Sequence, residues 1–150
     1  SWSYQALITP VNDQASGSGG ADKFGQSVSL AGDYLVVGAP NEDSNQTTIT
    51  QGTSASTDNS LENSGAAYVY KRSGTTWTQD AYIKAANAKS GNSRDAEFGS
   101  SVAIGTDKTI IVGAYAEGQS GRGVTNSNTI SGWCAWCAGY SGAAYVYKYD

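Results

Sequence analysis

Histidine and methionine are absent from the 150-residue sequence, and cysteine and proline occur only twice each. Without histidine, neither a Ser-His-Asp nor a Cys-His catalytic set can form, and the most frequent metal ligand is missing. No pair of carboxylates stands out as an acid–base couple. We therefore expect a protein that is not an enzyme and that uses no cofactor.

Basic residues are also scarce. Nine Lys and Arg stand against thirteen Asp and Glu, which gives a net charge of −4, and Lys71 and Arg72 are the only adjacent basic pair. Nucleic acids and anionic membranes select for clustered positive charge. No apolar run approaches the roughly 20 residues of a membrane-spanning helix. We expect neither nucleic acid as a partner nor a membrane span.

The first residue is Ser1 rather than methionine, which predicts a chain that begins after a processing event or is a fragment. The two cysteines, the acidity and the many Ser, Thr and Asn residues together favour an extracellular or cell-surface location.

Glycine and aromatic residues are abundant, with 19 Gly, 10 Tyr and 4 Trp. Aromatic and β-branched residues favour strands. The apolar runs are short and are separated by Gly, Ser, Asn and Asp, a pattern that predicts an all-β fold.

An internal repeat is the strongest feature of the sequence. Four blocks recur in the same order, 74 to 77 residues further along the chain. The blocks 2–8, 23–28, 37–40 and 64–71 match the blocks 77–83, 97–102, 112–115 and 141–148. We therefore divide the chain into two repeats, residues 1–76 and 77–150.

Each repeat is predicted to contribute four strands, eight in all. Long insertions rich in Ser, Thr, Asn and Gly, Asn41–Asn63 and Ala116–Tyr140, fall at the same point of both repeats. Long loops often carry function, and these two should emerge from the same face. The expected strands are Trp2–Ile8, Ser27–Leu30, Tyr34–Val37, Ala67–Tyr70, Trp77–Ile83, Val102–Ile104, Thr109–Val112 and Ala144–Tyr147.

Two short motifs recur in the repeat. Phe24-Gly25 is followed by Val37-Gly38-Ala39-Pro40, and the second copy has Phe98-Gly99 and Val112–Tyr115, with Tyr in place of Pro. With the Gly-Ala-Ala-Tyr-Val-Tyr block and the Trp-led strand, the sequence resembles the FG-GAP repeats. These form blades of the integrin α-chain β-propeller and occur in many bacterial surface proteins.

The resemblance covers nearly the whole chain and implies four-stranded antiparallel blades with a role in extracellular recognition or adhesion. Propellers typically have about four to eight blades. Two blades cannot close a propeller, so we expect them to be completed by neighbouring subunits or by a longer chain.

The sequence departs from the calcium-binding members of that family, which carry an Asp-x-Asp-x-Asp-Gly loop between FG and GAP. Here the corresponding turns contain one carboxylate each, Asp33 and Asp107. Calcium prefers six to eight oxygen ligands. We expect no metal site there and no control of stability by calcium.

Cys134 and Cys137 form a Cys-x-x-Cys motif in a glycine-rich loop. No strand–helix–strand pattern surrounds it, and zinc would need two more ligands. A local disulfide is our leading interpretation, with free thiols and redox or metal chemistry as alternatives. The neighbouring Trp133, Trp136 and Tyr140 could pack on their own blade, contact a partner protein or stack on a sugar.

A sequon, Asn45-Gln46-Thr47, lies in the first long insertion. Asn45 is therefore a candidate site of N-glycosylation.

The chain ends predict how copies associate. The resemblance implies that the Trp-led strand follows the Tyr-Val-Tyr strand as the outer strand of a blade. In that order, residues 24–83 form a whole blade, residues 98–148 lack the outer strand, and the N-terminal strand lacks a blade. An unpaired edge invites strand addition from a neighbouring molecule, and such a head-to-tail contact builds a ring or a filament. The residues expected to meet are Trp2, Tyr4, Leu7 and Ile8 of one molecule and Tyr145 and Tyr147 of the next.

The leading hypothesis is an extracellular structural or adhesive module that self-assembles in this way or binds partner proteins. The alternative is a lectin-like propeller module that binds carbohydrate through its long loops.

Overall fold

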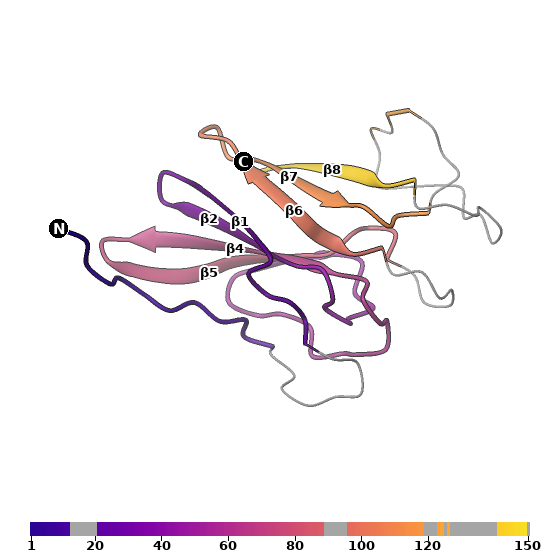
Figure 1. The fold of residues 1–150 in the computed structure, drawn as a ribbon, viewed down its shortest axis with the longest axis horizontal. Coiled ribbons are helices and arrows are strands. Elements are labelled where there is room, and N and C mark those ends of the chain that lie inside the picture. Colours follow the sequence, from indigo (N-terminus) through magenta and orange to yellow (C-terminus); the bar gives the residue numbers. More distant parts are fainter. Residues whose placement is uncertain (13–20, 89–95, 119–122, 125, 127–140, 150) are drawn as a thin grey trace.

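The computed structural model describes residues 1–12, 21–88, 96–118, 123–124, 126 and 141–149. This part of the chain forms eight strands and no helix, in two antiparallel sheets that lie face to face (Figure 1). The all-β prediction is therefore confirmed. Among these residues there is no helix with the length and apolarity to cross a membrane.

The first sheet has five strands in the order β1-β2-β4-β5-β3. The order of its first four strands is the one predicted for a complete blade. Strands β4 and β5 pair along their length, with one bulge where Asp80 is the extra residue. The strands are β1 (Ser27–Ala31), β2 (Tyr34–Ala39), β3 (Ile49–Gln51), β4 (Ala66–Ser73) and β5 (Thr76–Ile83).

The second sheet has three strands, β6 (Phe98–Ile104), β7 (Thr109–Ala114) and β8 (Ala143–Lys148), in the order β6-β7-β8. Strand β8 pairs with β7 on one side, and no described strand pairs with it on the other. Within the described part of the chain, the second sheet thus has no counterpart of β5.

The main hydrophobic core lies between the sheets. Alternate residues of β4, Ala67 and Val69, point into it, because side chains along a strand alternate between the two faces. Phe98 is fully buried there. Ile110 and Val112 of β7 complete the opposite wall.

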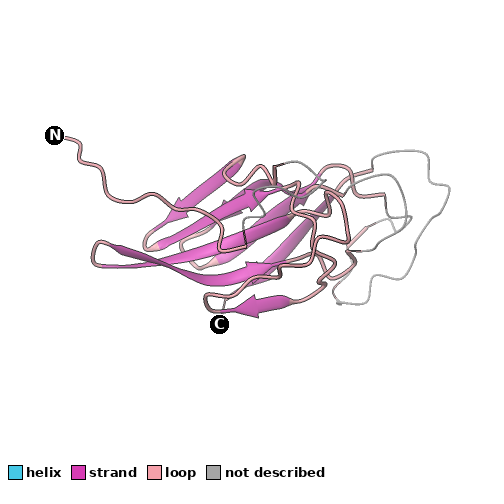
Figure 2. Cartoon of the chain, turned by 90° about the horizontal axis from the view of Figure 1, so that it is seen from below, coloured by secondary structure: helices cyan, strands magenta, loops and turns pink. Residues whose placement is uncertain are grey.

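The predicted N-terminal strand is not formed within the single chain. Residues 2–8 form no strand, and Figure 2 shows this segment as a loop that extends beyond the sheets. Trp2, Tyr4 and Leu7 are exposed. Strand β3 already pairs with the outer edge of β5 at Ala81–Ile83, so this segment does not extend the first sheet there.

Strand β3 was not predicted. It lies within the first long insertion and spans only three residues, Ile49–Gln51, too few for an alternating pattern to stand out. Its pairing with β5 gives that insertion a fixed place beside the first sheet.

The sheets and the sequence repeats are out of phase by one strand. Strand β5 opens the second repeat of the sequence, yet it pairs with β4 and completes the first sheet. A fourth strand for the second sheet would accordingly come from the start of a further repeat.

Candidate functional site

The contact between the two sheets is built around the FG motif of the second repeat. The Gly99 carbonyl accepts a hydrogen bond of 2.8 Å from the Ser27 hydroxyl. A Cβ atom added at Gly38 would overlap the Gly99 carbonyl, and one added at Gly65 would overlap the backbone of Phe98. The two glycines therefore form a socket for the Phe98-Gly99 backbone, and any residue with a side chain at either position would block it.

The FG motif of the first repeat has the same local packing but no such contact. Phe24 packs edge-on against Tyr68 with ring centroids 5.2 Å apart, as Phe98 does against Tyr145 at 5.1 Å. A Cβ atom added at Gly25, however, would meet nothing within 4 Å. In this copy Gly25 is exposed and Phe24 is half-buried on the outer face of the first sheet.

The second sheet carries a copy of the glycine socket. Gly113 corresponds to Gly38, and Gly142 corresponds to Gly65. A Cβ atom at Gly113 would overlap only the Ser101 side chain, and the atom nearest to one at Gly142 is the Tyr115 carbonyl, 3.3 Å away. No described FG motif lies against this second socket.

Two apolar faces are exposed next to these motifs. On the first sheet, Val28 and Leu30 are exposed, although their equivalents in the second repeat pack against the main core. On the second sheet, Val146 is 68% exposed, although its equivalent Val69 is buried between the sheets. The exposed Val28, Leu30 and Val146 thus occupy positions whose equivalents pack in the buried interface, whereas the tyrosines on the outer face of the first sheet are already covered within the chain.

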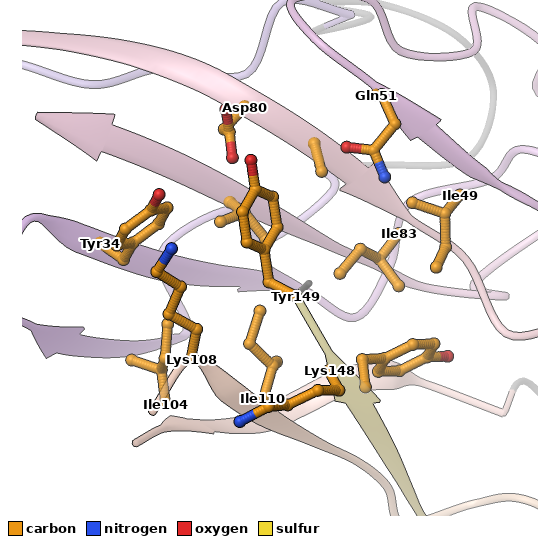
Figure 3. Close-up of a pocket in the computed structure, with 13 residues that line it drawn as sticks. Tyr34, Ile49, Gln51, Asp80, Ile83, Ile104, Lys108, Ile110, Lys148 and Tyr149 are labelled. Carbon is orange, nitrogen blue, oxygen red and sulfur yellow. The ribbon is translucent and has the colours of Figure 1, made fainter. Parts of the chain in front are cut away.

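A groove runs between the sheets beside β8. Its wall is largely apolar and includes Ile49 and Ile83 from the first sheet and Ile110 from the second (Figure 3). The Lys108 ammonium lies 4.7 Å from the centroid of the Tyr149 ring at its rim. Because the free edge of β8 adjoins the groove, a fourth strand there would cover apolar surface as well as pair with β8.

A buried polar cluster lies where the first insertion meets the end of β5. Lys84 Nζ is 2.6 Å from Glu42 Oε2 and 2.6 Å from Ser64 Oγ, and the Lys84 and Glu42 side chains are 0% and 2% exposed. The Asn12 side-chain amide donates to Glu42 Oε1 at 3.3 Å, and the Tyr68 hydroxyl donates to Asn12 Oδ1 at 2.7 Å. Burial lowers the pKa of Lys84, and the Glu42 carboxylate acts against that shift.

The second repeat contains an equivalent cluster around Glu117. The Tyr145 hydroxyl lies 2.8 Å from Asn87 Oδ1 and 3.1 Å from Glu117 Oε2. Burial raises the pKa of Tyr145 and of Tyr68, so both hydroxyls keep their protons and remain donors. Sequence reasoning missed both clusters. The offset of 75 residues that relates Asn12 to Asn87 also relates Glu42 to Glu117 and could have revealed them.

The structure places the other predicted residues as follows. Asn45 is exposed, and its side-chain amide donates to Ser60 Oγ at 2.8 Å. Tyr145 and Tyr147 turn inward against Phe98, so β8 offers its backbone edge rather than these rings. Ile8 packs against a second hydrophobic cluster, on the face of the first sheet that points away from the second sheet.

Five predicted residues lie outside the described part of the chain: Cys134, Cys137, Trp133, Trp136 and Tyr140. The disulfide and the aromatic carbohydrate- or protein-binding surface therefore stay predictions. Among the described residues, no group of three or more Cys, Asp or Glu is placed to hold a metal ion.

Comparison with known proteins gives one match. The sequence model of the FG-GAP repeat family matches residues 2–70 and 77–128. No curated protein and no solved structure matches the chain. The matched segments cover most of the chain and begin at the two Trp-led segments of the internal repeat.

Proposed function

Because the chain belongs to the FG-GAP repeat family, we propose that it is an extracellular structural or adhesive module whose copies join head to tail. One observation carries this proposal. Exposed apolar residues on the two outer sheet faces, Val28, Leu30 and Val146, stand at positions whose equivalents pack in the molecule's own internal interface, so the contact between the sheets can be repeated between molecules.

The repeated contact would bring the outer face of one molecule's second sheet against the first sheet of the next. Phe24 and Gly25 of the second molecule would enter the socket formed by Gly113 and Gly142, as Phe98 and Gly99 enter the socket of the first sheet. Val146 would be buried as Val69 is. Such a contact joins two different surfaces, so it propagates into a closed ring or an open filament.

The N-terminal segment fits the same contact. In the first sheet Ala67 lies opposite Ile83, and Tyr68 lies opposite Tyr82. Transferring this register by the repeat places Ile8 of the neighbouring molecule opposite Ala144, and Leu7 opposite Tyr145. The added strand would pair with the free edge of β8 and cover the groove beside it, by the β-strand addition that many proteins use for recognition.

The experiment that tests the proposal is sedimentation velocity over a range of protein concentrations, comparing the wild type with Gly113→Ala. Within one molecule this substitution requires only that the Ser101 side chain rotate. In the assembly, the added methyl group would meet the backbone of the incoming FG motif. We expect the wild type to form larger species as concentration rises and Gly113→Ala to stay monomeric with an unchanged unfolding midpoint.

Gly118→Ala is the matched control, because a Cβ atom there meets nothing within 4 Å. It should assemble as the wild type does. Deletion of residues 1–9 should also abolish the larger species. A wild type that remains monomeric throughout, or a Gly113→Ala variant that assembles normally, would show that separate chains do not join in this way.

A further inference from the structure

The ion pair of the first sheet is supplied by its outer strand. Lys84 directly follows Ile83, the last residue of β5, and its ammonium reaches Glu42 and Ser64 on the neighbouring segments. The cluster therefore depends on one feature of β5, the positively charged side chain that directly follows its last paired residue.

The cluster of the second sheet has the same backbone frame. The Gly65 amide donates to the Glu42 carbonyl at 2.8 Å, and the Gly142 amide donates to the Glu117 carbonyl at 3.0 Å. The hydroxyl of Ser64 donates to Glu42 O at 3.1 Å, and that of Ser141 donates to Glu117 O at 2.8 Å. Glu117 is thus held in the position that Glu42 occupies in the first sheet.

The cation is the difference between the clusters. Glu117 is only 6% exposed, and no Lys or Arg of the described residues forms an ion pair with it. Its side chain is instead within hydrogen-bond distance of the Tyr145 hydroxyl. A buried carboxylate is far more stable with a cation at hydrogen-bond distance. In the first sheet that cation comes from β5, which has no counterpart among the described strands of the second.

We propose that the edge of β8 binds, as its preferred partner, a β-strand that carries a lysine or arginine directly after its last paired residue, and that this cation pairs with Glu117. The inference rests on the proposed function in one respect, the acceptance of an added strand by this edge. A strand from a further repeat, with the pattern of Trp77–Lys84, meets the requirement.

The chain's own N-terminal segment can supply a strand but not the lysine or arginine that should follow it. The residue equivalent to Lys84 is Thr9, whose side chain cannot supply a positive charge. Head-to-tail addition of the N-terminal strand therefore leaves Glu117 without a cation, and it is the weaker of the two ways to fill the edge. The cluster gives β8 a means of discriminating between strands that are otherwise alike.

The test uses the full chain and fluorescein-labelled peptides with the sequence of residues 76–88, and fluorescence anisotropy measures binding. One peptide has the natural sequence, and a second carries Lys84→Thr. A third carries Lys84→Thr together with Thr78→Lys, which keeps the net charge and moves the cation. Because the protein is acidic, this third peptide controls for non-specific attraction.

We expect the natural peptide to bind about tenfold more tightly than both altered peptides, since only it can place a hydrogen-bonded cation beside the Glu117 carboxylate. In Glu117→Gln protein the difference should shrink to within about twofold. Equal binding of the three peptides, no binding of any, or a lysine preference that persists in Glu117→Gln would overturn the proposal. The comparison among peptides on wild-type protein stands even if Glu117→Gln does not fold.

These outcomes are independent of the sedimentation experiment. A wild type that stays monomeric refutes head-to-tail joining of separate chains, whereas the peptides test the edge of β8 directly. A protein that self-associates but binds the three peptides equally would refute only the role of Glu117.

Discussion

Replacing Lys84 with methionine should be among the most damaging substitutions in this protein. Methionine matches the length of the lysine side chain but removes its charge. Glu42 would then remain buried, with hydrogen bonds from the Asn12 amide at 3.3 Å and the Ser44 backbone N–H at 3.2 Å. Removing one partner of a buried ion pair costs roughly 3–5 kcal/mol, because the other charge stays desolvated.

A loss of that size is large for a small domain, whose total stability is about 5–15 kcal/mol. Urea denaturation measures it. With an m-value of about 2 kcal/mol/M, the unfolding midpoint of Lys84→Met should fall by roughly 1.5–2.5 M urea.

Two variants serve as controls. Glu42→Gln combined with Lys84→Met removes both charges and should recover more than half of the loss, since a neutral pair has little desolvation penalty. Lys148→Met makes the same substitution in the exposed pair with Asp107 and should change the midpoint much less. If Lys84→Met unfolds at the wild-type midpoint, or if the double variant is no more stable than the single one, the argument from the buried pair is wrong.

Three further outcomes are expected. Gly38→Ala should lower the unfolding midpoint clearly, because the alanine methyl group overlaps backbone across the sheet interface. Gly113→Ala should leave the midpoint unchanged, and equal effects of the two substitutions would contradict the socket geometry. Burial raises the pKa of Tyr70 to about 12, above its unfolded value of about 10, so stability should be complete below about pH 10 and fall between pH 10 and 12. Urea midpoints at pH 9 and 11 test this, and Tyr70→Phe should reduce the difference between them. Intact-mass measurement after alkylation should show Cys134 and Cys137 protected until a reductant is added, and alkylation of both without reductant would exclude the disulfide.

Much of the fold could be predicted because its causes are local. Alternation of apolar residues in β1 and β2, with a turn at Gly32 between them, specifies a hairpin from adjacent residues alone. The repeated FG and GAP motifs specify where two backbones must approach each other, because only glycine permits that approach at Gly38 and Gly65.

The candidate site was only partly predictable. The missing outer strand of the second sheet follows from the order of the blocks along the chain. The cluster of Glu42 and Lys84 does not, because its residues are 42 positions apart and meet only when β5 pairs with β4. Strand β3 was missed for the same kind of reason, since its three residues become a strand only by pairing with β5.

The sequence by itself determined the all-β class, the two repeats and the positions of seven of the eight strands, because periodicity and glycine placement act over a few residues. Tertiary structure alone decided which strand-forming segments become strands. Residues 2–8 and 77–83 share a pattern, yet only the second lies beside the free edge of β4, and a strand needs a partner for its backbone hydrogen bonds. The same pairing buries Lys84 beside Glu42, whereas no described Lys or Arg forms an ion pair with Glu117, since charges are matched only where the chain brings them together.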